Sequence, residues 1–380
     1  MSSPCDGSAI DQAMMAKAVK LAARGQYTCM PNPSVGCVIT SGDSVVGEGW
    51  HQFAGQAHAE VNALKGAGNQ AKDATAYVTL EPCSHYGRTP PCADALIAAG
   101  VSRVVYGMTD PNPSVAGQGL EKLRQAGITV DGPILEAEAR QLNKGFIKRQ
   151  EHGLPWVTIK LAMSLDGRTA MESGESQWIT GAAARQDVQR LRAKSCAIVT
   201  GIGTVLHDDP SLTVRADELG FENTAEAAKV AARQPLRVVV DSQLKTPADA
   251  KVLSSGGEVL IVTARANTQQ KKAQKNKAEV VCLAESNGQV DLPALLKLLA
   301  EKECNNVLVE AGAELAGAFL QAGLVDEFVV YMAPKLLGSS ARPLLTLPFE
   351  RMDQQVSLHI QDVRQVGDDL RITARPILSS

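Results

Sequence analysis

The stretch from His58 to Cys92 constrains the fold and the chemistry of this chain more than any other, because potential metal ligands flank a buried strand there. Thr75 to Leu80, TAYVTL, has the composition of such a strand and ends at Glu81-Pro82. Cys83 therefore falls in the turn at the carboxyl end of the strand, where α/β sheets usually place ligands. We expect a functional site at this strand end.

The stretch offers one imidazole, His58, and two thiols, Cys83 and Cys92. Three such ligands leave a tetrahedral zinc ion one open position. A water held at an open position has its pKa lowered to about 7. Glu60 follows His58 by two positions and suits the carboxylate that carries protons without binding the metal. The residues therefore predict a hydrolytic zinc site.

The spacing of these residues matches the signature of zinc deaminases, H-x-E followed by P-C-x-x-C, with one departure. The second thiol comes nine positions after the first instead of three. The intervening SHYGRTPP brings His85 and Arg88 to the edge of the site, and Arg88 can hold a substrate phosphate. The alternative is a closed, structural zinc site with His85 or His51 as fourth ligand, which would leave Glu60 without a purpose beside the metal.

Helices and strands alternate around this stretch, as is typical of a three-layer α/β domain. The 380 residues suffice for two domains. The charged segment 148–155, KRQEHGLP, indicates a linker, so we expect domains over residues 1–150 and 151–380. In the first domain we expect helices at 14–24, 58–64, 92–99, 120–125 and 134–143, and strands at 36–40, 45–50, 75–80, 103–106 and 128–130.

The same alternation begins again after Pro155. We expect strands at 156–162, 197–200, 237–241, 259–263, 280–283 and 307–310, helices at 182–193 and 292–302, an Ala-rich helix after Gly312, late antiparallel strands at 324–333 and 364–374, and a polar surface insertion at 218–234. No G-x-G-x-x-G follows the first strand. Gly312 and Gly317 instead open and line a helix that either binds a phosphate at its N-terminus or packs tightly after its strand.

The net charge of -3 provides no broad basic surface, so a small substrate is expected rather than a nucleic acid. No apolar run is long enough to span a bilayer, and the N-terminus does not have the pattern of a secretory signal. Eight cysteines at these spacings indicate cytosolic thiols. We expect a cytoplasmic homo-oligomer, a dimer or a tetramer, without membrane or nucleic-acid partners.

Several motifs resemble the bifunctional deaminase/reductase family of riboflavin biosynthesis. NPSVG at 32–36 and EPCSHYGRTPPC at 81–92 are similar to its deaminase half, and KLAMSLDGRTA at 160–170, SQWITG at 176–181 and TGIGTVLHDDPSLTVR at 200–215 to its reductase half. The resemblance extends through the whole chain. It implies an N-terminal cytidine-deaminase-like α/β/α domain and a C-terminal dihydrofolate-reductase-like α/β domain.

The resemblance also implies two reactions. The first is the zinc-dependent deamination of a 2,5-diamino-6-ribosylamino-pyrimidinone 5'-phosphate to the corresponding uracil. The second is the reduction of the ribosyl C1' to a ribityl chain, with NADPH as hydride donor. By the same resemblance His58, Cys83 and Cys92 are zinc ligands and Glu60 is the proton carrier, and the substrate contacts of the deaminase would be Asn32, His51, His85 and Arg88.

In the reductase half, the resemblance implies a set of cofactor contacts and a set of substrate contacts. The residues that would face NADPH are Ala162, Trp178, Thr204, Asp208, Ser242, Gly312, Ala313, Glu314, Leu315, Ala316, Gly317 and Ala318. The residues that would face the substrate are Ser176, Arg192, Leu212, Arg215 and Glu310.

Two side chains are candidates for proton delivery as hydride arrives, Lys160 and Asp208. The alternatives are a strand-end lysine in solvent and a turn aspartate that caps a helix. Trp178 can likewise be a core residue instead of a cofactor contact.

Two other functions remain open from the residues themselves. One is a deaminase for a free nucleoside or for a base flipped from RNA, which would leave the second half without a function. The other is a non-catalytic zinc module joined to a nucleotide-binding sensor. It predicts four protein ligands on the metal.

Overall fold

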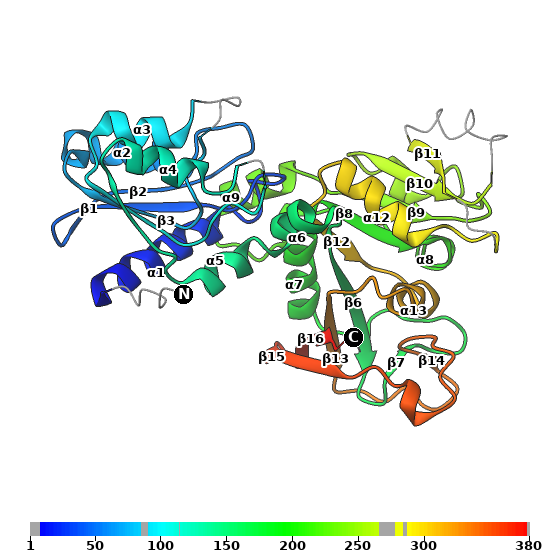
Figure 1. Ribbon diagram of the computed structural model, residues 1–380. Helices are drawn as coiled ribbons and strands as arrows, with labels where there is room; N and C mark the ends of the chain where they lie inside the picture. Colours follow the sequence, from blue (N-terminus) through cyan, green and yellow to red (C-terminus); the bar gives the residue numbers. More distant parts are fainter. Residues whose placement is uncertain (1–7, 85–89, 114, 266–277, 284–286, 378–380) are drawn as a thin grey trace. The chain divides into compact units, whose positions relative to one another are not determined.

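The computed structural model describes residues 8–84, 90–113, 115–265, 278–283 and 287–377. The chain divides into two compact units, Met1–Gly153 and Leu154–Ser380 (Figure 1). Within the described residues, no helix is both long and apolar enough to cross a membrane.

The first unit alternates helices with short strands. Its elements are α1 (Ala9–Arg24), β1 (Gly36–Ser41), β2 (Ser44–Trp50), α2 (Ala59–Ala67), the 3-10 helix η1 (Gly68–Ala71), β3 (Thr75–Val78), α3 (Cys92–Ala99), β4 (Arg103–Tyr106), α4 (Gln118–Gln125), β5 (Thr129–Asp131), α5 (Glu136–Leu142) and α6 (Lys144–His152).

A five-stranded sheet of order β2-β1-β3-β4-β5 forms the middle layer of this unit. β1 is antiparallel to β2 and β3, whereas β3, β4 and β5 run parallel. The helices α2, α3 and α4 pack on one face, and α1 packs on the other (Figure 1). The predicted three-layer α/β/α domain is confirmed.

Close approach between the layers depends on small residues. A Cβ at Gly36 would lie 2.0 Å from the carbonyl oxygen of Ala18 on α1, and a Cβ at Gly49 would lie 2.3 Å from that of Ala59 on α2. Because real Cβ atoms do not tolerate such distances, glycine at these positions brings both helices onto the hairpin of β1 and β2. This packing holds the start of α2 near the end of β3.

The second unit is larger. Its elements are β6 (Trp156–Ser164), β7 (Arg168–Ala170), α7 (Ala182–Ala193), β8 (Ala197–Gly201), α8 (Ile202–Asp208), η2 (Ala216–Glu218), α9 (Thr224–Ala232), β9 (Leu236–Val240), α10 (Lys251–Ser254), β10 (Val259–Thr263), β11 (Ala278–Cys282), α12 (Leu292–Glu301), β12 (Asn306–Val309), α13 (Ala313–Gln321), β13 (Glu327–Ala333), β14 (Arg342–Pro343), η3 (Met352–Gln354), β15 (Leu358–Val366) and β16 (Asp369–Pro376).

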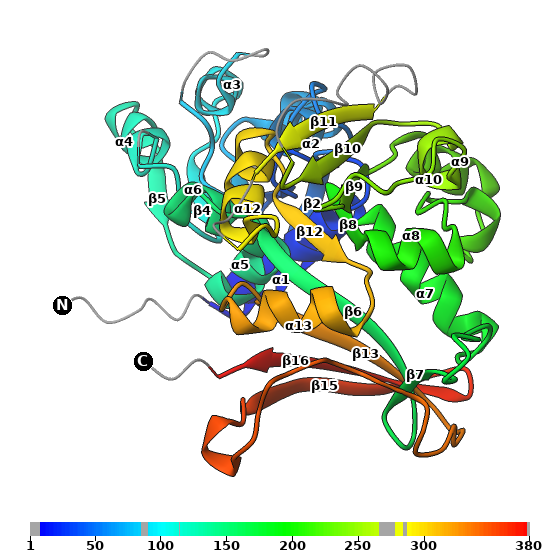
Figure 2. The same ribbon diagram turned by 90° about the vertical axis from the view of Figure 1, so that its right-hand side faces the viewer.

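The main sheet of this unit has nine strands in the order β11-β10-β9-β8-β12-β6-β13-β16-β15. The strands from β11 to β13 run parallel, and the hairpin of β16 and β15 is antiparallel to β13. Figure 2 shows α12 and α13 on one side of the sheet and α7 and α8 on the other. Carboxyl ends of the parallel strands meet at one edge, which is where such sheets bind ligands.

Two predictions of local structure are wrong. Residues 148–152, expected in a linker, belong to helix α6, in which Gly145 and Ile147 are buried. The run 364–374, expected as one strand, is a hairpin, because the positive φ of Gly367 lets the chain turn between β15 and β16. The expected helix at 92–99 and the strands at 103–106 and 259–263 are confirmed in full.

Candidate active sites

Three predicted metal ligands meet where β3 ends and two helices begin. His58 is the N-cap of α2, Cys92 is the first residue of α3, and Cys83 lies in the turn after β3. The His58 Nδ1 atom is 3.2 Å from Cys92 Sγ and 3.7 Å from Cys83 Sγ. The fold therefore brings three residues that are far apart in the sequence into one compact cluster.

The donor atoms of this cluster fit a zinc ion. They all lie within 4.8 Å of one another, and a tetrahedral zinc with nitrogen and sulfur ligands requires separations of roughly 3.5 to 3.8 Å. Within the described residues the group has three members, His58, Cys83 and Cys92. Three protein ligands leave the fourth position for solvent or substrate.

The two thiols differ in their tendency to ionise. Hydrogen bonding from Cys92, with a further contribution from His58, lowers the pKa of Cys83 to about 4. Its Sγ also accepts from the Cys92 backbone N–H at 3.3 Å. The hydrogen bond to Cys83, followed by burial, holds the pKa of Cys92 well above its usual range. One thiolate is therefore favoured even without a cation, and a metal would favour the second.

Glu60 lies in the first turn of α2 and is 3% exposed. Burial raises the pKa of its carboxyl to about 7. A carboxyl of this kind can both accept and donate a proton near neutral pH.

His51 and Asn32 lie beside the cluster. The His51 ring meets the His58 ring edge to face, with centroids 5.3 Å apart. His51 Nδ1 is 3.2 Å from the Ala57 carbonyl oxygen, which can only accept, so Nδ1 carries the proton and Nε2 accepts from Asn32 Nδ2 at 3.0 Å. Burial lowers the pKa of His51. Both ring nitrogens have partners, so His51 does not provide a fourth ligand.

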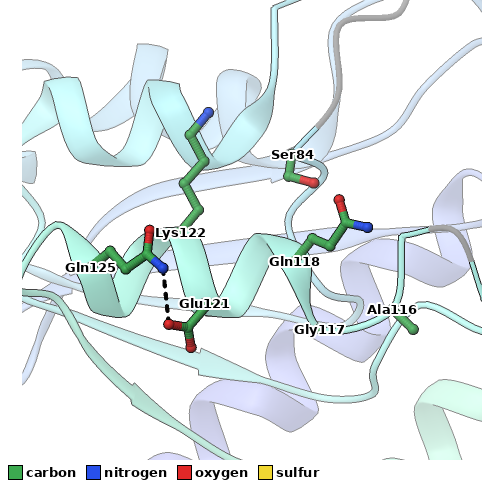
Figure 3. A pocket seen from close by; sticks show the side chains of 7 residues that line it. All are labelled: Ser84, Ala116, Gly117, Gln118, Glu121, Lys122 and Gln125. Carbon is green, nitrogen blue, oxygen red and sulfur yellow. Dashed lines mark hydrogen bonds between the residues drawn. The ribbon is translucent and has the colours of Figure 1, made fainter.

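An open cavity of about 710 Å³ lies beside Ser84, the residue after Cys83 (Figure 3). Its other lining residues come from α4 and the residues just before it: Ala116, Gly117, Gln118, Glu121, Lys122 and Gln125. His85 and Arg88, predicted to contact the substrate, lie outside the described residues.

The N-terminus of α4 borders this cavity but does not offer a free anion site. The Gly117 and Gly119 N–H groups donate to the buried carboxylate of Glu81, and Lys122 pairs with Asp94. A helix N-terminus binds an anion through unoccupied N–H groups. Here a side chain of the protein already occupies them.

In the second unit, three predicted residues converge where β12 ends beside β6: Glu310 follows β12, Lys160 lies in the middle of β6 and Arg192 lies on α7. The Arg192 guanidinium on α7 donates from Nε to Glu310 Oε1 at 2.6 Å and from Nη2 to Oε2 at 2.9 Å. Burial opposes ionisation of Glu310, but Arg192 outweighs it and holds the pKa of Glu310 below its ordinary value. Burial lowers the pKa of Lys160, on which both charges act. Lys160 is therefore not a strand-end lysine in solvent.

The other predicted substrate residues differ in accessibility. Arg215 is exposed and pairs with Glu218 at 2.6 Å. Ser176 is half-buried. The Leu212 side chain is 3% exposed and packs in the core under a backbone φ of 53°, so only its backbone is available to a ligand.

The predicted cofactor residues border the strand-end edge of the nine-stranded sheet. Gly312 is the N-cap of α13, and a Cβ there would meet nothing within 4 Å, which leaves the helix mouth open to a phosphate. Ala316 and Gly317 face the interior instead, because a Cβ at Gly317 would lie 2.2 Å from the Thr346 carbonyl oxygen. The part of this stretch that is open to a ligand is therefore its first turn.

Further features of this edge suit a dinucleotide. The buried Thr200 hydroxyl, at the end of β8, has no hydrogen-bond partner among the described residues. Trp178 is 63% exposed, so it is not a core residue, and the Arg185 guanidinium lies 4.6 Å from its ring. Ala162, Thr204 and Ser242 are half-buried, and Asp208 is exposed at the end of α8. The residues present fit a nucleotide cofactor.

Sequence reasoning missed Glu81, Thr200 and Arg185. Glu81 had a detectable signal, since an acidic residue directly after a buried strand needs partners. Thr200 and Arg185 had no such signal in the sequence. The position of Thr200 depends on the strands beside β8, and that of Arg185 depends on its contact with the Trp178 ring. The alternative role for Asp208, a turn aspartate that caps a helix, describes its neighbour instead. Asp208 is the last residue of α8, whereas Asp209 accepts from the N–H of Lys251 at the start of α10.

Comparison with known proteins gives one family match in each unit. Residues 8–108 match the family described as "Cytidine and deoxycytidylate deaminase zinc-binding region", and residues 155–372 match "RibD C-terminal domain". "Riboflavin biosynthesis protein RibD" of Escherichia coli K12 is 53% identical over 95% of this chain and 98% of its own length. These matches span the zinc cluster and the Arg192–Glu310 pair.

Two solved structures are similar over almost the whole chain. RibD of Acinetobacter baumannii, form 1, is 47% identical with a TM-score of 0.89 and covers 97% of this chain and 99% of its own. A diaminohydroxyphosphoribosylaminopyrimidine deaminase/5-amino-6-(5-phosphoribosylamino)uracil reductase of Thermotoga maritima is 30% identical with a TM-score of 0.84 and the same coverage. With its deaminase-type zinc cluster and its reductase domain, the chain belongs to the RibD family of riboflavin biosynthesis proteins, bifunctional enzymes that combine a zinc-dependent deaminase with an NADP-dependent reductase.

Proposed function

We propose that the two activities are divided between the two parts of the chain, with deamination in residues 1–150 and reduction in residues 151–380. The separate compact units and the separate family matches support this division. The substrate of the first part would be the 2,5-diamino-6-ribosylamino-pyrimidinone 5'-phosphate, and its deaminated product would be the substrate of the second.

His58, Cys83 and Cys92 would hold the zinc ion of the deaminase. The observation that carries this proposal is the proximity of their three donor atoms, all within 4.8 Å, beside a buried carboxylate. Zinc bound there supplies Lewis acidity that makes a water nucleophilic at neutral pH. The protein residues then have to orient the ring and move protons.

Glu60 would move those protons. It takes the proton that the attacking water loses and delivers it to the ring nitrogen next to the carbon under attack. A second proton passes to the departing amino group as the carbon–nitrogen bond breaks, so ammonia leaves and a carbonyl remains. The burial of Glu60 suits this role, because a carboxyl shielded from bulk water does not lose the proton to solvent.

Asn32 and His51 would bind the pyrimidine. Their mutual hydrogen bond fixes the orientation of both side chains next to His58. His85 and Arg88 would complete the substrate site, with Arg88 on the 5'-phosphate. The closed zinc site with His51 as fourth ligand is disfavoured, because Ala57 and Asn32 occupy both ring nitrogens.

In the second part, Arg192, Arg215, Glu310, Ser176 and the Leu212 backbone would bind the ribosyl phosphate substrate. Arg215 is exposed and suits the phosphate, whereas the Arg192 fork is held by Glu310 and suits a fixed contact with the sugar.

When bound at this site, NADPH would supply the hydride for the ribosyl C1' carbon. As the bond from C1' to the ring oxygen breaks, that oxygen needs a proton to become the hydroxyl of the ribityl chain. Lys160 would donate it. Burial lowers the pKa of Lys160, and Glu310 and Arg192 act on its charge, whereas Asp208 is exposed at a helix end. Asp208 is the second candidate for this role and also a proposed cofactor contact.

The proposed cofactor residues are those at the strand-end edge of the nine-stranded sheet. They are Ala162, Trp178, Thr204, Asp208, Ser242 and the helix start from Gly312 to Leu315, with Ala316 to Ala318 forming the remainder of that helix stretch. The open mouth at Gly312 and the exposed Trp178 support the assignment.

A homo-oligomer, dimer or tetramer, is also proposed. β15 is an edge strand of the sheet and exposes Leu358, Ile360 and Val363 by 47%, 59% and 53%. An exposed apolar edge strand favours pairing with another chain. For the compartment we propose the cytoplasm, since eight cysteines at these spacings in a chain of 380 residues are unlike the disulfide framework of a small secreted protein.

One assay tests the proposed function as a whole. The protein is incubated with the diaminopyrimidine phosphate and either NADPH or NADH, and ammonia and absorbance at the nicotinamide band are followed. We expect ammonia with the diaminopyrimidine phosphate and not with cytidine, and NADPH oxidation only after deamination. Deamination of cytidine in preference would favour the nucleoside deaminase, and a zinc ion with four protein ligands by X-ray absorption would favour the structural module.

A further inference from the structure

Glu81 stands two residues before the ligand Cys83 and is 4% exposed. Its carboxylate accepts three backbone hydrogen bonds, from the N–H groups of Asp110 at 3.1 Å, Gly117 at 2.9 Å and Gly119 at 2.8 Å. Hydrogen bonds to an ionised acceptor are about twice as strong as neutral ones. The turn that carries Cys83 is thereby tied to the segment leading into α4.

The start of α4 also packs closely against the turn that carries Cys83. A Cβ at Gly119 would lie 1.9 Å from the Pro82 carbonyl oxygen and 3.2 Å from Glu81 Oε1. Only glycine lets the first turn of α4 approach the Glu81-Pro82-Cys83 turn this closely. The hydrogen bonds to Glu81 and the packing against Pro82 therefore act on the two residues directly before Cys83.

The long separation of the two cysteines explains why such a tie is needed. In a C-x-x-C pair both thiols belong to one turn, so one turn fixes both. Here Cys92 is fixed as the first residue of α3, nine positions after Cys83. On the α3 side, the Cys83 backbone carbonyl accepts from the Ala93 N–H at 3.1 Å. Glu81 provides the contact on the opposite side of the turn, through α4.

We propose that Glu81 is a positioning residue of the zinc site, which sets the place of the Cys83 thiolate by fastening its turn to the start of α4. Glu81 does not touch the metal or the substrate. This inference rests on the proposed ligand set, because it requires Cys83 to bind zinc. Loss of such an outer partner typically lowers metal affinity 10- to 100-fold.

The variant Glu81→Gln tests the proposal on the full-length chain. Glutamine keeps the size but offers one acceptor oxygen and an NH2 group, so at least one of the three N–H groups loses its acceptor. Zinc affinity is measured by competition with a chromophoric chelator. The cobalt-substituted protein is examined for its thiolate-to-cobalt absorption band, which reports the cysteine geometry. The matched control is Glu121→Gln on α4, whose side chain is exposed and bonds Gln125.

We expect Glu81→Gln to bind zinc 10- to 100-fold more weakly and to shift or weaken the cobalt band, while Glu121→Gln and the reductase activity stay at the wild-type level. A purely structural role would lower the unfolding temperature of the metal-free protein and leave both metal readouts unchanged. That result would overturn the proposal.

A second variant decides the matter if Glu81→Gln does not fold. Gly119→Ala keeps the Glu81 carboxylate but pushes α4 away from Pro82. The same loss of zinc affinity and the same change of the cobalt band are expected, and wild-type values would overturn the proposal.

Cys83→Ser distinguishes an error in the proposed ligand set from an error in the role of Glu81. If Cys83→Ser keeps zinc and the cobalt band, the ligand set itself is wrong, whereas if only the Glu81 and Gly119 variants behave as wild type, the positioning role alone is wrong.

Discussion

Arg192 donates two parallel hydrogen bonds to the carboxylate of Glu310, 2.6 Å and 2.9 Å long, although the two residues are 118 positions apart in the sequence. The two side chains are 13% and 9% exposed. A fork-to-fork pair fixes both partners in orientation as well as in distance. Before any ligand binds, the reductase unit therefore already holds an ionised carboxylate at the end of β12, next to Lys160.

The geometry of this pair predicts that Arg192→Lys impairs reduction. Lysine keeps the charge but replaces the planar fork with a single point donor, so the orientation of Glu310 is lost. We expect kcat/KM of the reductase to fall about 10- to 100-fold, or roughly 1.4 to 2.7 kcal/mol. Deamination serves as the internal reference. Arg190→Lys, on the same helix but bonded to the Leu219 and Gly220 carbonyls, should retain wild-type reduction.

Two isosteric substitutions distinguish Lys160 from Asp208 as the proton donor of the reductase. We expect Lys160→Met to lower the reductase kcat by about 10²- to 10⁴-fold, because no proton would reach the departing oxygen, and Asp208→Asn to have a smaller effect. The measurement is single-turnover NADPH oxidation with the deaminated substrate. A large loss in Asp208→Asn with an active Lys160→Met would reverse the two roles.

Glu60→Gln should abolish deamination while the metal stays bound. The amide keeps the shape of a side chain that is 3% exposed but cannot accept the proton of water, so ammonia release should fall about 10²- to 10⁴-fold. Zinc content by elemental analysis should remain one per chain, and the reductase should be unaffected when the deaminated substrate is supplied. Wild-type ammonia release in a folded Glu60→Gln would contradict the mechanism.

The Asp11–Arg103 pair predicts a pH-dependent part of the stability of the first unit. Hydrogen bonding from Arg103 lowers the pKa of the Asp11 carboxyl from 3.8 to about 2, so the folded chain binds this proton more weakly than the unfolded chain. The stabilisation is complete above about pH 4 and is lost as the pH falls towards 2. At pH 7, Asp11→Asn should lower the free energy of unfolding by about 2 kcal/mol.

Urea unfolding curves between pH 7 and pH 2.5 check this expectation. The difference between wild type and Asp11→Asn should shrink steadily below pH 4. Asp94→Asn removes the more exposed pair with Lys122 and should cost less than about 1 kcal/mol. A difference that stays constant with pH would show that Asp11 acts through packing instead of charge.

The edge strand β15 predicts where copies of the chain meet. Ile360→Lys places a charge on an exposed apolar edge, which is a known way to prevent pairing of strands. We expect the molar mass by light scattering to fall to that of a smaller assembly, with both activities measured in parallel. Thr373→Lys on the neighbouring β16, which is already paired on both sides, is less suitable because it would disturb the sheet itself.

Much of the fold could be predicted because its strands are short, apolar and bounded by turn residues. The helix at 92–99 follows Pro91 and ends at Gly100, whose φ of 72° favours glycine, and both signals are local. The proposed zinc ligands could also be predicted from the sequence, since the residue types and their spacing indicate the chemistry.

Other features depended on contacts that the sequence does not reveal. The segment 148–152 is charged, and only its packing as part of α6 shows that it is helical. The run 364–374 differs from this segment, because Gly367-Asp368-Asp369 is a turn signal within the sequence itself, and the chain turns there between β15 and β16. Glu81 could have been suspected as a buried acid, but its three partners lie 29 to 38 positions away in the sequence.

The two thiols are anchored unequally, which has a consequence for how such an enzyme can be altered. The turn of Cys83 is held by α3 through the Ala93 N–H and by α4 through Glu81, whereas Cys92 belongs to α3 itself. Substitutions at the start of α4 therefore act on one thiolate and leave the other in place. The start of α4 is where the strength of metal binding can be adjusted without a change to any ligand.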